Sequence, residues 1–507
     1  MTHAHPDPAA PTVADLQEGF ASGRLSAEQA AAACLDRIAA ENPRLNAIII
    51  GNPEAMAEAR AIDARRAAGE ALGPLAGVPV VVKDTMDMAG FPSTGGWSLL
   101  CARTGGVDLL PGTDAPVVAR LRAAGAVILG KTNVPVLSAS GTHANNSWAG
   151  PTLNAVAPDL VPGGSSAGTA TAVAAGMAVL GLAEETGGSI QNPAAAQGLV
   201  GIKPSFGLVP NAGVMPLASQ RDVVGPIARC VRDAALTLDV LAGFTTEDPK
   251  TVAGVGNIPD GGYAAQLSPT ALAGRRIGLY GPGWRDQPLS AETADLYAAA
   301  QAVLRARGAV LVDDPFAGSG FAALRRPVSD EYQFDARGLE SVAHDLQRYL
   351  ERLGPRAALR SFADFARATA AKDAFAPGGT LHYLHLLPEF AAALADPLLP
   401  PPLREFTAVR AAYRRIFDAV MRAQRLDALV FPQARSALPA LHAGRQIAET
   451  TVSEINIAGL PGVTFPAGRH ASGAPFGLIL VGGMWSEAAL LAMAFDYETA
   501  TGGGAAG

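Results

Sequence analysis

The chain has 507 residues, of which 49% are hydrophobic and only 17% charged, and its formal net charge is −7. Charged residues make up about 25% of an average soluble protein, so this composition excludes a disordered chain and predicts a large buried fraction. The acidic balance offers no basic field for a phosphate backbone, which argues against nucleic-acid binding as the main function. Three cysteines, none of them in a CxxC pair, indicate reduced thiols in a cytoplasmic protein.

The first 70 residues predict helices. The opening MTHAHPDPAAPT has no basic segment followed by an apolar run, so we expect no signal peptide. Ser26 and Gln29 form a capping-box pattern, in which the two side chains satisfy the first free N–H groups of a helix. Because the residues after Ser26 keep an apolar stripe at helical spacing, a helix should begin there.

Between residues 70 and 240, short apolar strands alternate with alanine-rich helices. The strand candidates are 77–82, 126–130 and 198–202. Such alternation predicts a mostly parallel or mixed sheet that is covered by helices on both faces. The uncharged stretch 161–183 is long enough for a membrane span, but glycine, alanine, serine and threonine dominate it. We therefore expect a close-packed buried helix in this stretch.

Residues 285–425 have a different sequence pattern from the region before them. Arginine-rich amphipathic segments predict helices, and APGG at 376–379 and LLPPPL at 398–403 interrupt them. This region is expected to be a variable helical insertion or cap. Strand-like runs return near the end of the chain, at 428–432, 462–466 and 476–483, and a helix follows them. Because no internal repeat or linker divides the chain, residues 1–507 are expected to form one α/β domain.

Lysine is rare in this chain. Only five of the 39 basic residues are lysine, and Lys83, Lys131 and Lys203 each follow an apolar strand. Arginine stays protonated near neutral pH, whereas a buried lysine can lose its proton and act as a base. Each of the three is therefore a candidate general base. The alternative for each is a structural amine that bonds a neighbouring carbonyl or carboxylate group.

Two glycine-rich segments carry candidate nucleophiles. PGGSSAG at 162–168 places Ser165 and Ser166 before a predicted helix, where they could bind an anion or simply cap the helix. EETGGSIQNP at 184–193 places Ser189 after two glycines, which allow the backbone to approach a ligand closely. Neither segment contains a GxSxG pattern, and His143, the nearest histidine, has no neighbours that mark a Ser-His-Asp triad.

Two other patterns lead to alternatives. His382 and His385 have helical spacing, but no third ligand stands nearby, so a metal site is not expected. GSGFAA at 318–323 follows an apolar run and imitates a dinucleotide-binding loop, although the strand–helix–strand context is incomplete. A non-catalytic nucleotide-binding protein built on this loop is the alternative to an enzyme.

The glycine-rich segments belong to a longer resemblance. GGSSAG and EETGGSIQNPAAAQGLVGIKPSFG, together with VVVKDTMDMAGFPSTGG and GPTLNA upstream, closely resemble the signature of the amidase signature family. These are serine amidases with a Ser–cis-Ser–Lys triad. The likeness covers about residues 70–240 and 425–500, and several spaced motifs follow in the family's order. It implies an α/β/α fold around a large mixed twisted sheet, and hydrolysis of C–N bonds.

The resemblance also implies roles by position. Ser189 corresponds to the nucleophile, Ser165 to a bridging serine after a cis peptide bond, and Lys83 to the base. The backbone N–H groups of Thr186, Gly187, Gly188 and Ser189 resemble the oxyanion hole, and the supporting positions are Gly164, Ser166, Glu185 and Gln191. Lys131 and Lys203 then have structural roles. In this scheme Lys83 takes a proton from Ser189 through Ser165, and the relay returns it to the leaving nitrogen.

The chain departs from the family's pattern near the nucleophile. The family often has aspartate at position 185 and arginine at 191, where this chain has Glu185 and Gln191. A fixed ion pair is therefore expected to be missing or rearranged, which disfavours anionic substrates. We expect small neutral amides, anilides, carbamates (urethanes) or related esters as substrates. The reaction should need water but no metal or cofactor, in a monomer or homodimer that binds neither nucleic acid nor membranes.

Two questions stay open. Aromatic and apolar runs at 331–334, 362–365 and 382–390 are packing surface in one interpretation; in the other, some of them line an apolar mouth over Ser189 with few fixed charges. Within the same family, the alternative function is the A subunit of a tRNA-dependent amidotransferase, which uses glutamine and needs partner subunits.

Overall fold

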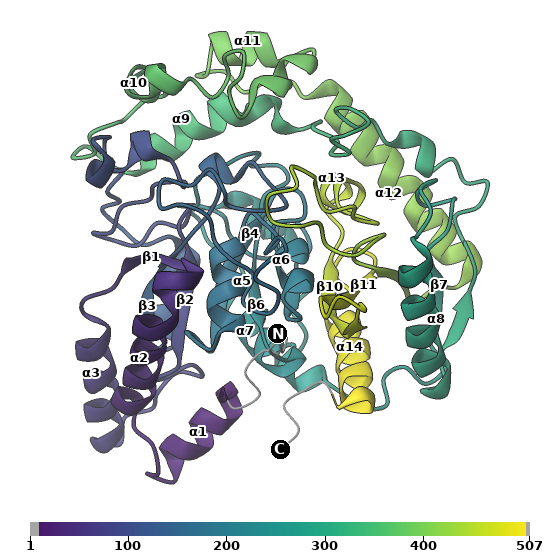
Figure 1. The fold of residues 1–507 in the computed structure, drawn as a ribbon, viewed down its shortest axis with the longest axis horizontal. Coiled ribbons are helices and arrows are strands. Elements are labelled where there is room, and N and C mark those ends of the chain that lie inside the picture. The colour runs from purple at the N-terminus through teal and green to yellow at the C-terminus, as the bar shows by residue number, and fades with distance from the viewer. Residues whose placement is uncertain (1–9, 503–507) are drawn as a thin grey trace.

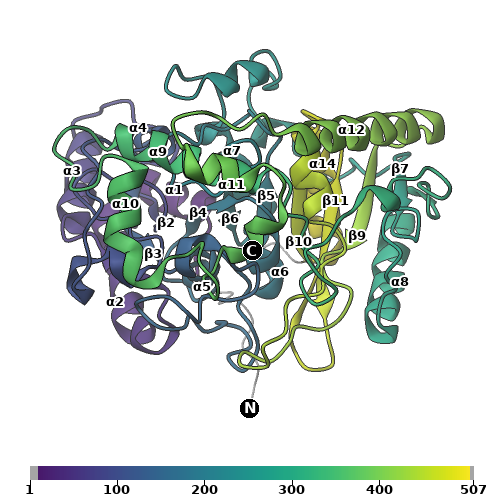
Figure 2. The same cartoon turned by 90° about the horizontal axis from the view of Figure 1, so that it is seen from above.

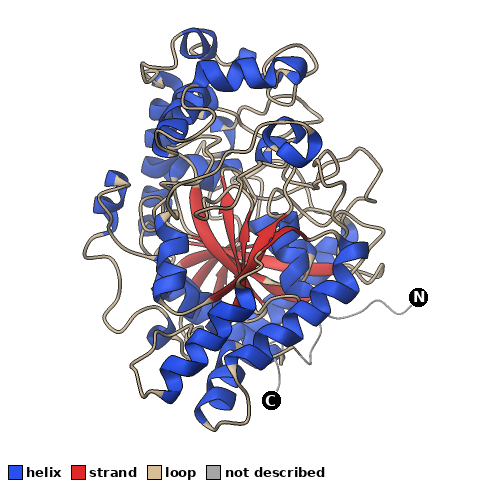
Figure 3. Cartoon of the chain, turned by 90° about the vertical axis from the view of Figure 1, so that its left-hand side faces the viewer, coloured by secondary structure: helices blue, strands red, loops and turns tan. Residues whose placement is uncertain are grey.

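A mixed, twisted sheet of 11 strands forms the centre of the computed structural model, which describes residues 10–502 (Figures 1 and 3). The strands are β1 (Ile48–Gly51), β2 (Pro79–Lys83), β3 (Val127–Thr132), β4 (Leu180–Glu185), β5 (Val200–Lys203), β6 (Val223–Ala228), β7 (Arg276–Leu279), β8 (Val310–Val312), β9 (Ala428–Pro432), β10 (Gly462–Arg469) and β11 (Pro475–Val481). Their order in the sheet is β1-β3-β2-β4-β6-β5-β10-β11-β9-β7-β8. Helices cover both faces, so the predicted α/β/α fold is confirmed.

Some of the helices begin at a residue whose side chain caps them. The helices are α1 (Val13–Ala21), α2 (Ala27–Leu45), α3 (Ala55–Ala67), α4 (Pro116–Ala123), α5 (Ala167–Ala174), α6 (Gln191–Ala196), α7 (Val231–Leu241), α8 (Ala291–Ala306), α9 (Val342–Arg352), α10 (Phe362–Thr369), α11 (Phe390–Ala395), α12 (Arg404–Gln424), α13 (Ser453–Ala458) and α14 (Glu487–Thr501). The predicted capping box is present, because Ser26 Oγ accepts a hydrogen bond from the Gln29 N–H at 3.0 Å.

The centre of the sheet brings distant segments together. Strand β2 pairs in parallel with β3 on one side and with β4 on the other. Carboxyl ends of parallel strands meet at the same edge of a sheet, so Lys83 at the end of β2 lies next to the end of β4. The segment that follows β4 carries the two glycines and Ser189.

Two elements differ from the sequence prediction. Residues before 70 were expected to be helical, but Ile48–Gly51 forms β1, antiparallel to β3, because its isoleucines are buried against the sheet. The uncharged stretch 161–183 holds the expected buried helix α5 and also the start of β4. No helix in the described part of the chain combines the length and the apolarity that a bilayer crossing requires.

Residues 285–425 do not form a purely helical insertion. Helix α8 and strand β8 lie within this range, and β8 extends the sheet by pairing in parallel with β7. Helices α9, α10 and α11 form an arch at the top of Figure 1, and Figure 2 shows the same arch from above. The buried faces of these three helices form one hydrophobic cluster with Trp97 and Leu100 of the core.

Candidate active site

Lys83 is completely buried at the end of β2, and its amine faces three oxygen atoms. Lys83 Nζ donates to Ser165 Oγ at 2.7 Å, to Glu184 Oε2 at 2.7 Å and to the Glu184 backbone oxygen at 3.0 Å. Of the three lysines that follow strands, Lys83 is the one whose amine contacts a candidate serine. The structure therefore brings together the predicted base and the predicted bridging serine.

The loop that carries Ser165 is packed tightly against the segment after Ser189. The peptide bond between Gly164 and Ser165 is cis, as the resemblance predicts. Gly163 has a positive φ of 77°, and a Cβ atom on it would lie 2.4 Å from the Cα of Pro193. Only glycine permits such a close approach. Ser166 precedes α5 but makes no capping bond; its hydroxyl donates to the Glu184 backbone oxygen at 3.3 Å.

Ser189 lies in the turn after β4 and is 5% exposed. Gly188 has a φ of 88°, and Gly187 has no room for a side chain because a Cβ atom would lie 2.3 Å from Phe334 Cε2. Within residues 10–502, the N–H groups of residues 186–189 donate no hydrogen bond to the protein. Four unpaired N–H groups around a serine are the donors that an oxyanion requires.

Glu185 and Gln191 replace the expected ion pair by hydrogen bonds. Glu185 Oε2 accepts from the backbone N–H groups of Ile190 at 2.8 Å and Gln191 at 3.1 Å. Glu185 Oε1 accepts from the Gln191 side-chain amide and from Asn456 Nδ2. These bonds tie Glu185 to both residues that directly follow Ser189 in the chain.

The other two strand-end lysines bond the backbone. Lys131 Nζ donates to the Pro92 backbone oxygen at 2.7 Å and to Ser93 Oγ at 2.9 Å. Lys203 Nζ donates to the backbone oxygens of Leu460 at 2.6 Å and Pro204 at 3.1 Å. Burial lowers the pKa of Lys203 to about 8, although the negative charge of Glu185 acts to raise it. Both amines thus hold neighbouring segments in place.

Comparison with known proteins decides the family. A family model described as Amidase matches residues 29–491. The chain belongs to the amidase signature family.

Three relatives illustrate the range of this amidase family. Peptide amidase from Stenotrophomonas maltophilia is 35% identical, with a TM-score of 0.80 and coverage of 97% of each chain. A bacterial aryl acylamidase is 26% identical, with a TM-score of 0.71, over 97% of this chain and 96% of that one. The A subunit of glutamyl-tRNA(Gln) amidotransferase from Synechococcus sp. is 32% identical over 96% of each chain.

One further carboxylate of this amidase contacts Lys83 and a second is linked to it through Thr186, and sequence analysis singled out neither of them. Glu184 forms a salt bridge of 2.7 Å with Lys83. Thr186 Oγ1 lies 3.2 Å from Glu184 Oε1 and 2.6 Å from Asp222 Oδ1, which links the two acids. Burial, together with the negative charge of Glu184, raises the pKa of Asp222 to about 8. The adjacent acids Glu184 and Glu185 were the one sequence signal for the contact between Glu184 and Lys83. Successive side chains of a strand point to opposite faces of the sheet, so two adjacent acids at a strand end place one carboxylate on each face.

A cavity of about 640 Å³ opens beside Gly187. Residues 331–334 and 444–449 form much of its wall, and Asn192, three residues after Ser189, also lines it. The charged residues in its wall are Arg285, Asp330, Glu331, Arg435, Arg445 and Glu449. The expectation of an apolar mouth with few fixed charges is therefore wrong for this cavity, because charged groups reach its wall from several separate segments of the chain.

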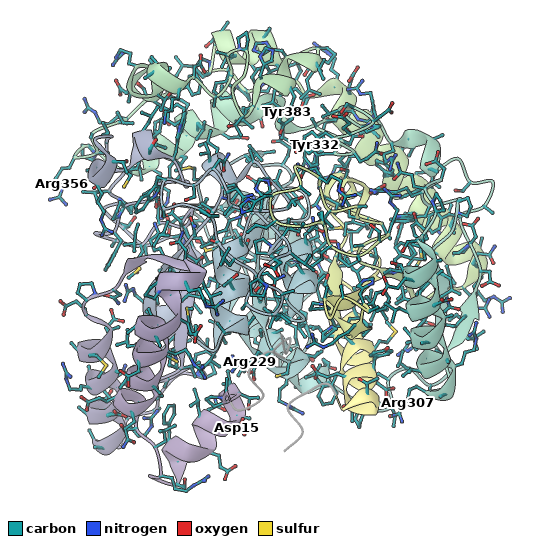
Figure 4. All side chains as sticks on the ribbon, in the orientation of Figure 1. Asp15, Arg229, Arg307, Tyr332, Arg356 and Tyr383 are labelled. Atoms are coloured by element: carbon teal, nitrogen blue, oxygen red, sulfur yellow. The ribbon has the colours of Figure 1, made fainter. Side chains whose placement is uncertain are left out.

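Of the three aromatic runs, only the first lines this cavity. Tyr332 packs edge-on against Tyr383 with ring centroids 5.5 Å apart, and Figure 4 shows both side chains beneath the arch of helices. The runs 362–365 and 382–390 instead supply the hydrophobic cluster under the arch, where Phe365 packs against Trp97. Packing surface is thus the correct interpretation for these two runs.

The remaining sequence patterns are structural. The last two residues of GSGFAA begin a short 3-10 helix, Ala322–Leu324, and Phe321 stacks on Trp284, so the loop does not open the α-helix of a dinucleotide site. His382 Nδ1 and His385 Nε2 both lie 3.1 Å from the Phe375 backbone oxygen. Among the described residues, no three histidine, cysteine or acidic side chains are arranged to hold a metal ion.

Proposed function

We propose that this amidase is a serine amidohydrolase that cleaves C–N bonds through an acyl-enzyme on Ser189. The contact of 2.7 Å between Lys83 Nζ and Ser165 Oγ carries the proposal. The loop of Ser165 packs against the segment after Ser189, and in the proposal Lys83, Ser165 and the turn of Ser189 act as base, proton relay and oxyanion site.

In the proposed mechanism, Ser189 attacks the carbonyl carbon of the bound amide. The Ser189 proton passes to Ser165, and the Ser165 proton passes to the lone pair of neutral Lys83. The N–H groups of residues 186–189 stabilise the oxyanion. The relay then runs in reverse and protonates the leaving nitrogen, after which water enters and the same groups activate it to hydrolyse the ester on Ser189.

The proposed substrates are small neutral carboxamides, anilides, carbamates and related esters. The cavity wall contains three arginines and three acids, so its formal charges balance. This balance supports a neutral substrate rather than an anionic one. The same polar wall fits acyl groups with hydrogen-bonding atoms, such as N-acyl amino acid amides, better than plain alkyl chains. The 35% sequence identity with peptide amidase supports the proposal of such acyl groups. We place the reaction in the cytoplasm, as the composition indicates.

One observation favours a second candidate. The A subunit of glutamyl-tRNA(Gln) amidotransferase is 32% identical over 96% of both chains. In that function the chain would release ammonia from glutamine for partner subunits instead of hydrolysing substrates on its own.

The purified chain alone tests the two candidates. The assay measures kcat/KM on a panel of neutral amides, anilides, carbamates and esters, with glutamine as the comparison. Hydrolysis of neutral amides without partner subunits supports the hydrolase. Activity confined to glutamine, or no activity until partner subunits are added, supports the amidotransferase function.

A further inference from the structure

We propose that Glu184 is a positioning residue that holds Lys83 as an ammonium ion in the resting enzyme and so sets the pH at which the relay begins to work. The inference rests on the proposed function, in which Lys83 must be neutral to accept a proton. The salt bridge of 2.7 Å between the two side chains is its structural basis.

The acceptors around Lys83 match an ammonium group. Ser165 Oγ, Glu184 Oε2 and the Glu184 backbone oxygen are the three acceptors of Lys83 Nζ among the described residues. An ammonium group has three hydrogens and no lone pair, so it satisfies all three contacts as a donor. A neutral amine has two hydrogens and one lone pair, and the lone pair must face a donor. Ser165 can become that donor only after Lys83 has lost one proton.

The pair is separated from water. The side chain of Lys83 is fully buried, and that of Glu184 is 2% exposed. Charges at hydrogen-bond distance interact more strongly in such surroundings than at the surface, and an opposite charge within about 4–6 Å favours the ionised form.

The nearest other acid does not take over the role of Glu184. Asp222 reaches the pair only through Thr186 Oγ1, at 2.6 Å from its Oδ1 atom. Burial and the charge of Glu184 raise the pKa of Asp222 to about 8, which disfavours a second negative charge beside the pair near neutral pH. Lys250 also acts on Asp222 and partly offsets its charge at higher pH.

Two more carboxylates are close in sequence but have other partners. Asp84 lies 3.9 Å from the amine of Lys131, which carries the opposite charge. Glu185 extends from the opposite face of β4, where it accepts from the N–H groups of Ile190 and Gln191. Among the described residues, Glu184 is thus the one carboxylate in contact with Lys83.

The proposed relay conserves the number of protons. At rest Lys83 carries three hydrogens and Glu184 none. Lys83 loses one proton to a base in the solvent, and its lone pair takes the Ser165 proton while Ser165 takes the Ser189 proton. The electron pair of Ser189 Oγ forms the new C–O bond. When the C–N bond breaks, the proton held by Lys83 returns through Ser165 to the nitrogen, and Glu184 stays ionised throughout.

The test is the pH profile of Glu184→Gln. Glutamine keeps the shape and an oxygen acceptor for Lys83 but removes the charge. In the wild-type chain, kcat/KM should rise with pH along one acidic limb. In Glu184→Gln the midpoint of that limb should fall by about 1–3 pH units. A merely structural role would lower the rate without moving the midpoint. An unchanged or higher midpoint in this variant overturns the proposal.

Two further variants control the experiment. Glu185→Gln is the same substitution one residue along, on the opposite face of β4, and it should leave the midpoint in place whatever it does to the rate. Glu184→Asp keeps the charge on a shorter side chain and should give an intermediate midpoint. If Glu184→Gln does not fold, Glu184→Asp decides, and a wild-type midpoint in that variant overturns the proposal.

Failure of this inference is distinguishable from failure of the proposed function. The rate at which a fluorophosphonate labels Ser189, measured against pH, provides a profile that does not depend on the substrate. An acidic limb that disappears in Lys83→Ala but does not move in Glu184→Gln refutes only the role of Glu184. A Lys83→Ala variant with the wild-type profile refutes the relay itself.

Discussion

Replacing Gly187 with alanine tests whether the turn before Ser189 must keep its position for catalysis. An added Cβ atom would lie 2.3 Å from Phe334 Cε2. Carbon atoms pack at about 3.5–4.0 Å, so the turn or the ring has to move by more than about 1 Å. Gly187 is not among the residues with positive φ, so the collision alone opposes alanine. A misplacement of about 1 Å can cost about 10²-fold in rate, and we expect a loss of that size.

The collision can be relieved from the other side. Phe334→Leu removes Cε2 and Cζ, so the double variant Gly187→Ala/Phe334→Leu should regain at least about tenfold in kcat/KM, about 1.4 kcal/mol. Gly51→Ala is the matched control, because a Cβ atom there meets nothing within 4 Å. The assays are kcat/KM on a neutral amide and the labelling rate of Ser189. A Gly187→Ala variant with wild-type rates would refute the inference that this turn holds the oxyanion donors.

Four other outcomes are expected. A fluorophosphonate should add one label to the chain by intact-protein mass spectrometry, and Ser189→Ala should abolish both label and turnover; a label that persists moves the nucleophile elsewhere. Lys83→Ala and Ser165→Ala should each lower kcat by about 10²–10⁴-fold, and the double variant should lose no more than the worse single one, because the relay fails as a unit. Neutral amides should surpass matched carboxylate-bearing amides in kcat/KM, and a tenfold preference for the charged member contradicts the balanced-charge cavity. Burial raises the pKa of Glu498 to about 7, so the folded state keeps a proton that the unfolded chain has lost, and stability falls by about 3 kcal/mol between about pH 4.5 and 7. Glu498→Gln should therefore have a higher Tm than the wild type at about pH 8 and an equal one at about pH 4, and equal Tm values at both would contradict the shift.

Strands that are buried on both faces could be predicted from the sequence. The runs that became β2, β3, β9 and β11 are continuous apolar segments bounded by glycine, proline or a charge, and their predicted ends lie within a few residues of the observed ones. Strand β4 escaped prediction because it ends in Glu184 and Glu185. Two acids normally indicate a loop. They are tolerated here because each has partners on its own side of the sheet.

The candidate site was predictable where the chemistry is local. The glycines around Ser165 and Ser189 are required by backbone geometry, so the motif itself marks the loops. The contacts of Lys83 are of another kind. Glu184 lies 101 residues from Lys83 along the chain, and only the parallel pairing of β2 with β4 brings them together. No local pattern specifies that a carboxylate will face the amine.

The cavity beside Gly187 shows why substrate specificity was the least predictable property. Residues 331–334 and 362–365 both carry aromatic side chains at short spacing, yet the first run lines the cavity and the second packs against Trp97. Periodicity shows that a face is apolar, but the surface that covers this face depends on the path of the whole chain. The cavity wall also includes Gly187, and Asn192 and the loop 444–449 reach it from other parts of the sequence. Because these segments meet only in the folded chain, single substitutions in that loop should alter substrate ranking while the labelling of Ser189 stays intact.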